Sequence, residues 1–266
     1  MALNNPVIYE SFLIDAASYE DICLIGQGRF GSMQKVKLRS SRSDGPPEFF
    51  AKRTLGSNSG ADDSQKRFMR EIEAYILTKR HPAICKFYGF TIGQPQSFIV
   101  EYLSNGSLQN LIDNHAKMPI NDQYDTIRAK TIFGIAAALV HLRNHSLFHR
   151  YLTPQNVLFD ENWEPRLVDF AFAKSEINEN ISQTVIGSTD GGYTAYQAPE
   201  MLNGSDQYDG RVDLFAFGML MFHVCTGTRP FGTMASFKIM REILSGKRPP
   251  IPDFIEPRLA NMIQDL

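Results

Sequence analysis

The feature that most restricts the fold is a glycine-rich segment at residues 24–31, which reads Leu-Ile-Gly-Gln-Gly-Arg-Phe-Gly. Polar and apolar residues alternate after it as far as Leu38, and this period of two predicts an extended strand. A dinucleotide-binding fold would instead begin a helix within the glycines. The segment therefore predicts two strands joined by a glycine turn, whose backbone can approach phosphate groups because no side chain intervenes. Taken alone, the motif fits an ordinary glycine hairpin equally well.

The rest of the first third of the chain contains further strands and one helix. A strand is predicted at residues 48–53, after a turn-rich segment, and another at residues 98–100. Between them, Phe68, Ile72 and Tyr75 recur at helical spacing. The remaining two thirds of the chain are rich in helix signals, so the sequence predicts two unequal lobes.

Composition limits the functional classes. The net charge is -2 and the pI about 6.3, so nothing indicates a nucleic-acid partner. Residues 212–225 form the most apolar long segment, which is shorter than the about 20 residues of a membrane span and predicts a buried helix without membrane insertion. Cys23, Cys85 and Cys225 are odd in number and far apart, and no signal peptide is evident, so we expect a cytoplasmic protein with reduced thiols.

A second informative stretch is residues 149–156, which reads His-Arg-Tyr-Leu-Thr-Pro-Gln-Asn. It is followed by a predicted strand, a turn, and the sequence Asp169-Phe170-Ala171. A glycine flap, a lysine, Asn156 and Asp169 are suitable groups for a site that holds phosphate and metal. His141, His145 and His149 fall four residues apart, but no further ligands accompany them, so we do not expect a metal centre there.

These motifs together resemble a family. Residues 149–156 are similar to the H-R-D-L-x-x-x-N catalytic loop of protein kinases, and residues 169–171 to the D-F-G motif that holds magnesium. Residues 198–200 read Ala-Pro-Glu, the motif that closes the activation segment, and residues 101–108 resemble the hinge between the two kinase lobes. The chain thus resembles a eukaryotic protein kinase domain, closest to the tyrosine-kinase-like group.

The resemblance implies an α+β, protein-kinase-like two-lobed fold. It pairs a small antiparallel β-sheet lobe and one helix with a larger, mainly α-helical lobe. Residues 1–18 would be an N-terminal extension, and the kinase-like domain would cover residues 19–266. Within it we expect an N-lobe at 19–100, a hinge at 101–105 and a C-lobe at 106–266. The C-lobe looks truncated, because family members continue into another helix.

The resemblance also implies a site for ATP and Mg²⁺. Lys52 would contact the phosphates, Glu71 would pair with it (Glu73 being the fallback), and Asn156 and Asp169 would hold the metal. A register shift of one residue would put Arg53 at the lysine position and Ala51 against adenine. The expected cofactor-binding residues are Ile25, Gly26, Gly28, Phe30, Gly31, Met33, Lys52, Glu101, Leu103, Asn156 and Asp169.

Three positions on the acceptor side depart from the family pattern. Tyr151 stands where the catalytic aspartate accepts the proton of the acceptor hydroxyl, and a phenol with a pKa near 10 cannot copy that role. Thr153 replaces a lysine common in serine/threonine kinases, and Tyr193 replaces a threonine that usually bonds the aspartate–lysine pair. Ala171 replaces the glycine of D-F-G, which restricts the backbone at that turn.

Three hypotheses follow. The first is a pseudokinase that binds nucleotide, with lost or strongly reduced phosphoryl transfer, and acts in signalling by binding a protein partner. The second is an active or weakly active kinase that transfers the ATP γ-phosphate to a Ser, Thr or Tyr hydroxyl of a protein substrate. The third is a scaffold without nucleotide, in which Phe50 fills the adenine site.

Overall fold

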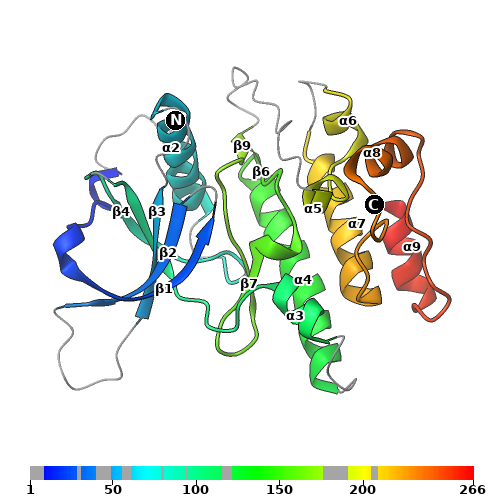
Figure 1. The fold of residues 1–266 in the computed structure, drawn as a ribbon, viewed down its shortest axis with the longest axis horizontal. Coiled ribbons are helices and arrows are strands. Elements are labelled where there is room, and N and C mark those ends of the chain that lie inside the picture. The colour runs from blue at the N-terminus through cyan, green and yellow to red at the C-terminus, as the bar shows by residue number, and fades with distance from the viewer. Residues whose placement is uncertain are drawn as a thin grey trace.

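The computed structural model describes residues 9–28, 31–39, 49–55, 61–78, 81–93, 95–115, 122–175, 191–204 and 209–266. These residues form two lobes, with a small sheet and helix α2 on one side and a bundle of helices on the other (Figure 1). The predicted α+β, two-lobed fold is therefore confirmed.

The small lobe is built on a five-stranded antiparallel sheet with the order β1-β2-β3-β5-β4. Its strands are β1 (Tyr19–Gly28), β2 (Gly31–Leu38), β3 (Phe49–Leu55), β4 (Phe87–Thr91) and β5 (Ser97–Glu101). The first two strands form the predicted glycine hairpin, in which Gly28 pairs with Gly31. The hairpin thus continues as a strand and not as a helix, as its alternating pattern predicted.

Helix α2 (Ala61–Thr78) packs on one face of this sheet. Phe68, Ile72 and Tyr75 are buried, because their spacing places them on the same side of the helix. The Phe68 ring stacks on Phe98 of β5 with 4.5 Å between the centroids. Burial of each such side chain stabilises the fold by about 1.5–3 kcal/mol, so this face fixes α2 on the sheet.

The described part of the N-terminal segment extends the sheet along β4. The Phe90 N–H donates to the Phe12 carbonyl, and the Ile14 N–H donates to the Phe90 carbonyl, each at 2.9 Å. A Cβ at Gly89 would lie 2.3 Å from the Phe12 carbonyl oxygen, so this close approach requires glycine. The Tyr9 hydroxyl also donates to Glu73 on α2 at 3.2 Å, which links the segment to the helix.

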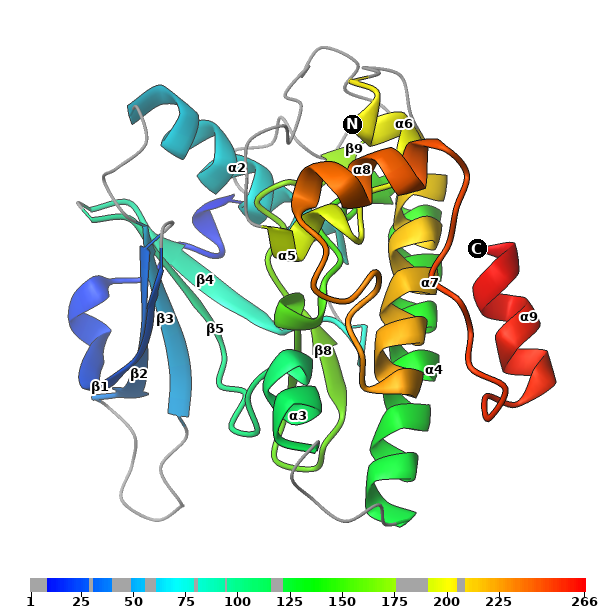
Figure 2. The ribbon, with the colours of Figure 1, turned by 45° about the vertical axis from the view of Figure 1, so that its right-hand side comes forward.

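The larger lobe is mainly helical, and its helices α4 and α9 pack against α7 (Figure 2). Its helices are α3 (Leu108–His115), α4 (Asp122–Asn144), α5 (Gly191–Thr194), α6 (Pro199–Leu202), α7 (Arg211–Thr226), α8 (Ser236–Leu244) and α9 (Pro257–Asp265). Short strands and 3₁₀ turns complete the fold: η1 (Ala16–Ser18), β6 (Leu147–Phe148), η2 (Pro154–Asn156), β7 (Val157–Phe159), β8 (Pro165–Leu167) and β9 (Lys174–Ser175).

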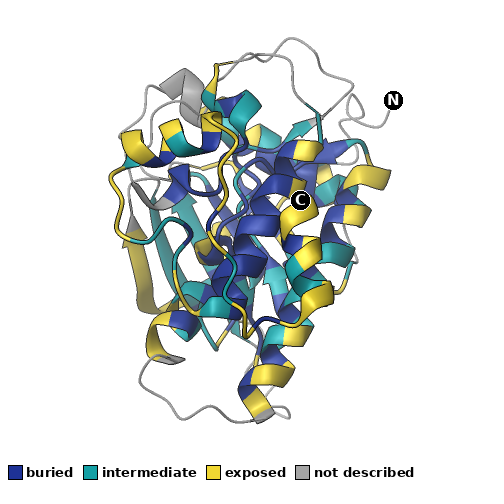
Figure 3. Cartoon of the chain, turned by 90° about the vertical axis from the view of Figure 1, so that its right-hand side faces the viewer, coloured by how far each residue is buried: buried dark blue, intermediate teal, exposed yellow. Residues whose placement is uncertain are grey.

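Helix α7 is the centre of the larger lobe. Almost all of its residues are buried, and the exposed residues of the lobe lie on the outward faces of the surrounding helices (Figure 3). At Gly218, a Cβ would come within 3.0 Å of the Leu266 side chain, so the glycine allows the end of α9 to approach α7 closely. Residues 212–225 are thus part of a core helix, as predicted, and among the described helices none has the length and apolarity of a membrane span.

Two polar residues of α7 are buried, Asp213 and His223. His223 Nδ1 lies 2.7 Å from the Tyr196 hydroxyl, and this hydrogen bond satisfies both groups within the core. Burial lowers the pKa of His223 to about 4, because the charged ring would lose its hydration. His223 is therefore neutral in the folded protein near pH 7.

We expect acid to destabilise the protein through His223. Its pKa is about 4 in the folded chain and 6.5 ordinarily, so between these values the unfolded chain binds more protons. The free energy of unfolding should then fall as the pH drops from about 6.5 to about 4, by up to about 3 kcal/mol at 1.36 kcal/mol per pKa unit. Thermal unfolding measured across this range checks the expectation.

His223→Gln is the matched variant, because glutamine keeps a polar partner for Tyr196 but takes up no proton. His149 is also buried with a lowered pKa, so some acid sensitivity should remain in the variant. A variant that loses stability as steeply as the wild type over this range would show that His223 is not responsible.

Candidate nucleotide site

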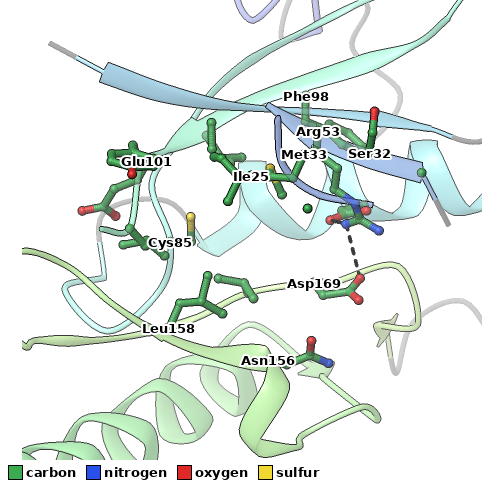
Figure 4. A pocket seen from close by; sticks show the side chains of 18 of the residues that line it. Ile25, Ser32, Met33, Arg53, Cys85, Phe98, Glu101, Asn156, Leu158 and Asp169 are labelled. Carbon is green, nitrogen blue, oxygen red and sulfur yellow. Dashed lines mark hydrogen bonds and ion pairs between the residues drawn. The ribbon is translucent and has the colours of Figure 1, made fainter. Parts of the chain in front are cut away.

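A pocket of about 350 Å³ lies between the two lobes (Figure 4). Most of the residues that the sequence assigned to nucleotide binding line it. The pocket residues of that set are Ile25, Gly26, Gly31, Met33, Glu101, Leu103, Asn156 and Asp169, and Glu71, which was expected to pair with the β3 cation, lines the pocket as well. Lys52 lies on β3 and does not line the pocket, Gly28 lies at the end of β1, and Phe30 lies outside the described residues.

One end of the pocket is an apolar slot. Ala51 and Val100 from the sheet lie on one side, and Leu158 and Val168 from the larger lobe on the other. Glu101 and Leu103, from the connection between the lobes, also line the pocket. A slot with apolar walls and a polar backbone edge is suited to a planar heterocycle such as adenine.

The structure corrects the predicted register of β3. The Lys52 ammonium points away from the pocket and pairs with Asp21 on β1. Arg53 instead lines the pocket, and its Nη1 lies 2.5 Å from Glu71 Oε1 and 3.4 Å from Asp169 Oδ1. The assignment of Lys52 to the phosphates is therefore wrong. Side chains alternate between the two faces of a strand, so a shift of one residue exchanges the partners of every side chain.

The same alternation decides the position of Phe50. Phe50 is buried on the outer face of the sheet with Val36 and Ile99, and its ring meets Tyr88 edge-on at 4.9 Å. Ala51 takes the pocket face instead. The adenine slot is therefore not filled by Phe50, which removes the observation on which the scaffold hypothesis depended.

Glu71 and Arg53 form a buried ion pair. Glu71 is 1% exposed, and burial raises the pKa of its carboxyl to about 7, although Arg53 and the Phe170 N–H act in the opposite direction. Burial would lower the pKa of Arg53, but the Glu71 and Asp169 carboxylates hold it above its ordinary value. The fallback residue Glu73 faces Tyr9 and not the pocket, so Glu71 is the carboxylate of α2 that reaches the site.

The loop at residues 149–156 is held by Asp213 from α7. The backbone N–H groups of His149 and Arg150 each donate to the Asp213 carboxylate at 2.7 Å. The two hydrogen bonds hold Arg150 with a φ of 65°, a conformation that residues other than glycine rarely adopt. Burial raises the pKa of Asp213, and His149 and these N–H groups oppose that rise.

His149 is neutral in this arrangement. Its Nε2 lies 3.0 Å from the Val168 carbonyl and donates to it, while its Nδ1 accepts from the Tyr151 N–H at 3.3 Å. Burial lowers the pKa of His149, which agrees with one donor and one acceptor nitrogen. The ring also contacts Phe170 at 5.1 Å, so it connects the loop to the segment that carries Asp169.

Tyr151 belongs to an aromatic cluster that we define as Tyr151, Phe172 and Tyr193. The Tyr151 ring lies 4.4 Å from that of Tyr193 and 5.1 Å from that of Phe172. The Tyr193 hydroxyl donates to the Arg150 carbonyl at 2.6 Å, which fixes the cluster on the loop. Two of the positions that differ from the family pattern thus contact one another, and Thr153 nearby in the loop is buried.

Asp169 and Asn156 keep oxygens that suit a divalent cation. Asp169 Oδ1 contacts both Arg53 and the Ala171 N–H, and the Asn156 Nδ2 donates to the Tyr151 carbonyl at 2.8 Å, so within the described residues no contact uses Asp169 Oδ2 or Asn156 Oδ1. No group of three or more His, Cys, Asp or Glu side chains able to hold a metal by itself occurs in the described part of the chain. Because Mg²⁺ is usually bound by one or two protein ligands together with substrate phosphates and waters, Asp169 and Asn156 fit a cation that is held jointly with a nucleotide.

The three spaced histidines do not converge on a metal either. The His141 ring stacks on His81 with the centroids 4.7 Å apart, and it lies tilted against His145 with the centroids 4.4 Å apart. His149 is instead buried in the loop. The spacing that seemed to indicate ligands thus reflects packing on α4 and the loop after it.

Comparison with known proteins identifies the class to which this site belongs. Residues 20–266 match the family model for protein tyrosine and serine/threonine kinases, and the chain belongs to this family. Aurora kinase of Saccharomyces cerevisiae is 31% identical over 208 residues, or 78% of this chain and 52% of that protein. Protein kinase C-like 1 of Caenorhabditis elegans is 30% identical over 91% of this chain and 33% of its own length. Serine/threonine-protein kinase 36 of Pongo abelii is 28% identical over 93% of this chain and 18% of its own length.

The chain therefore spans about half or less of the length of these relatives. Family membership supports a kinase-like ATP-binding domain, in a family that generally uses ATP with Mg²⁺ and acts on protein substrates.

Sequence reasoning missed several residues of the site. Phe172 was not assigned a role, although an aromatic residue directly after Ala171 was a usable signal. Tyr75 and Cys85 line the pocket from α2 and the segment before β4, and only packing between distant elements could place them there. Arg53 was the alternative to Lys52 at the lysine position, but the sequence could not decide which of these two adjacent cations of β3 faces the pocket.

The two cations of β3 should differ sharply in their contribution to stability. Arg53→Met leaves the Glu71 and Asp169 carboxylates without their shared cation, so we expect a loss of about 3 kcal/mol in the free energy of unfolding. Lys52→Met removes a surface ion pair on the other face, with an expected loss below about 1 kcal/mol. Urea unfolding of both variants is the measurement, and an equal or larger loss for Lys52→Met would contradict the observed register.

Proposed function

We propose that this chain is a pseudokinase domain of the tyrosine-kinase-like group, which binds ATP, transfers little or no phosphate, and acts in signalling by binding a protein partner. The observation that carries the proposal is the aromatic cluster of Tyr151, Phe172 and Tyr193 on the acceptor side of the loop. The run Asn105-Gly106-Ser107-Leu108 supports the group.

The cluster opposes phosphoryl transfer in two ways. A general base must reach the acceptor hydroxyl within hydrogen-bond distance and accept its proton, and Tyr151 offers a neutral phenol in place of a carboxylate. The ring is also bulky, and its contacts with Tyr193 and Phe172 hold it against the loop. Position 151 therefore offers no carboxylate base to an acceptor hydroxyl. The rings of Tyr151, Tyr193 and Phe172 also take up space on the acceptor side of the loop.

The nucleotide side keeps its main elements. The apolar slot takes a planar base, the glycine hairpin from the small lobe lies over the pocket, and Arg53 offers positive charge to phosphates. These groups come from both lobes, so a nucleotide binds best when the lobes are in this arrangement. ATP would thus stabilise one arrangement of the lobes, and a protein partner that recognises it would bind more tightly.

An active kinase is the second candidate, and specific contacts favour it. The Arg53–Glu71 ion pair is formed, Phe170 packs against Tyr75 at 5.0 Å, and Asp213 supports the loop. Positioning supplies much of the rate of phosphoryl transfer, so an assembled site could retain weak activity without the aspartate. We favour the pseudokinase, because a guanidinium also replaces the lysine that faces the phosphates.

The nucleotide half of the proposal predicts stabilisation by ATP. At a concentration about 100 times its Kd, ATP should raise the free energy of unfolding by about 2.7 kcal/mol, seen as an increase in Tm. Ala51→Leu should abolish the increase by filling the slot, while Lys52→Ala on the other face should leave it intact. A wild-type Tm that does not change at millimolar ATP would refute nucleotide binding.

The catalytic half predicts little or no phosphate transfer. With radiolabelled ATP and a mixture of basic and acidic acceptor proteins, incorporation by the wild type should not exceed that of Asp169→Ala. Label that Asp169→Ala removes and Tyr151→Asp increases would instead establish the active kinase.

A further inference from the structure

Residues 9–14, which we call the N-terminal segment, precede the part of the chain that matches the kinase family, and yet they are packed on the small lobe. Two hydrogen bonds of 2.9 Å join the backbone of Phe12 and Ile14 to that of Phe90 on β4. The side chains of Tyr9 and Phe12 pack against the main hydrophobic core, and that of Ile14 packs against the smaller core on the outer face of the sheet. The segment is therefore an integral part of this lobe.

Phe12 extends a column of aromatic rings that reaches the larger lobe. Its ring lies 5.5 Å from that of Phe87 on β4, and the Phe87 ring stacks on Tyr75 of α2 with 5.1 Å between the centroids. The Tyr75 ring meets Phe170 edge-on at 5.0 Å, and Phe170 directly follows Asp169. The N-terminal segment thus contacts one end of a continuous set of rings whose other end lies beside the pocket.

A second contact joins the segment to α2 itself. The Tyr9 hydroxyl donates to Glu73 Oε1 at 3.2 Å, and burial together with Glu73 raises the pKa of Tyr9 to about 12, so the hydroxyl keeps its proton near pH 7. Glu73 lies on α2 between Glu71 and Tyr75, and both of these residues line the pocket. Because a turn of helix moves as a unit, contacts at Glu73 and Tyr75 restrict the position of Glu71.

The surface of β4 is shaped to accept the segment at Gly89. The three atoms nearest to a Cβ at this position would all belong to the segment. They are the Phe12 carbonyl oxygen and two carbons of the Ile14 side chain, the latter at 2.5 and 2.7 Å. Gly89 is not among the glycines with a positive φ, so the close approach of the segment, and not the backbone conformation, requires glycine here.

We propose that the N-terminal segment is a positioning element of the pocket between the lobes. Docked on β4, it holds α2 and the column of rings in the arrangement in which Glu71 meets Arg53 and Asp169 faces the pocket (Figure 4). Its release loosens α2 and weakens the binding of a ligand in the pocket. Only the effect on ATP rests on the proposed nucleotide binding, since the effect on α2 is a property of the chain alone.

Gly89→Ala in the full chain tests the inference, because the added Cβ displaces the segment. Hydrogen exchange followed by mass spectrometry should become about tenfold faster or more in residues 9–14 and in α2. Exchange in α7 should not change, which distinguishes a local release from general unfolding. Gly93→Ala is the matched control, since a Cβ there would meet no atom within 4 Å, and it should exchange as the wild type does.

The effect on the pocket is measured with ATP on the same variants. ATP should bind Gly89→Ala about fivefold or more weakly than it binds the wild type and Gly93→Ala. Coupling between two sites is reciprocal, so saturating ATP should also slow the local exchange of residues 9–14 in the wild type, under conditions in which α7 stays folded. A segment that contributed only to overall stability would show no such local effect.

Tyr9→Phe keeps the test decisive if Gly89→Ala fails to fold. It removes the hydroxyl that bonds Glu73 and leaves the ring, so exchange in α2 should become about twofold to threefold faster, with α7 again unchanged.

Every other outcome counts against a stated part of the inference. Release of residues 9–14 without faster exchange in α2 would overturn it, and so would a Gly89→Ala variant in which the segment stays protected. Faster exchange in α2 with an unchanged ATP affinity would overturn the link to the pocket. A wild-type chain that binds no ATP would refute the proposed nucleotide binding, and the exchange of α2 would still decide whether the segment positions the helix.

Discussion

The ion cluster of Arg53, Glu71 and Asp169 connects three parts of the molecule that are distant in sequence. Arg53 lies on β3, Glu71 on α2 and Asp169 in the larger lobe. A buried carboxylate without a partner is costly, so the position of α2 depends on the guanidinium that neutralises Glu71. The pocket between the lobes exists in this form because one side chain satisfies both carboxylates.

The loop at residues 149–156 has two sides: one borders the pocket between the lobes, and the other carries Tyr151 at the position where the family has its catalytic aspartate. The backbone of the loop is fixed by two hydrogen bonds to Asp213 of α7, and Asn156 of the loop lines the pocket. Its other side is closed by Tyr151, which packs with Tyr193 and Phe172. The support of the loop thus does not depend on the residue at position 151, and this independence allows a change in chemistry without loss of the fold.

The sequence predicted most of the fold and much of the pocket. The glycine hairpin, α2 and the buried helix α7 followed from local periodicity and from glycine positions, which depend on a few neighbouring residues. The sequence could not choose between Lys52 and Arg53, because both are long cations in a short strand with aromatic residues before them. It also could not place Phe172 or Tyr75, whose positions depend on packing between distant segments.

By itself, the sequence determined the family, the order of the elements and the replacement of an aspartate by Tyr151, because these are properties of residues and their spacing. The tertiary structure decided which side chains meet. It assigned the pocket to Arg53 and the outer face to Lys52 and Phe50, since strand register is fixed by pairing with β2 and β5. It also brought Tyr151 against Tyr193, 42 positions further along the chain (193 − 151). Contacts of this kind arise only when the lobes and loops are packed together, so no local pattern could reveal them.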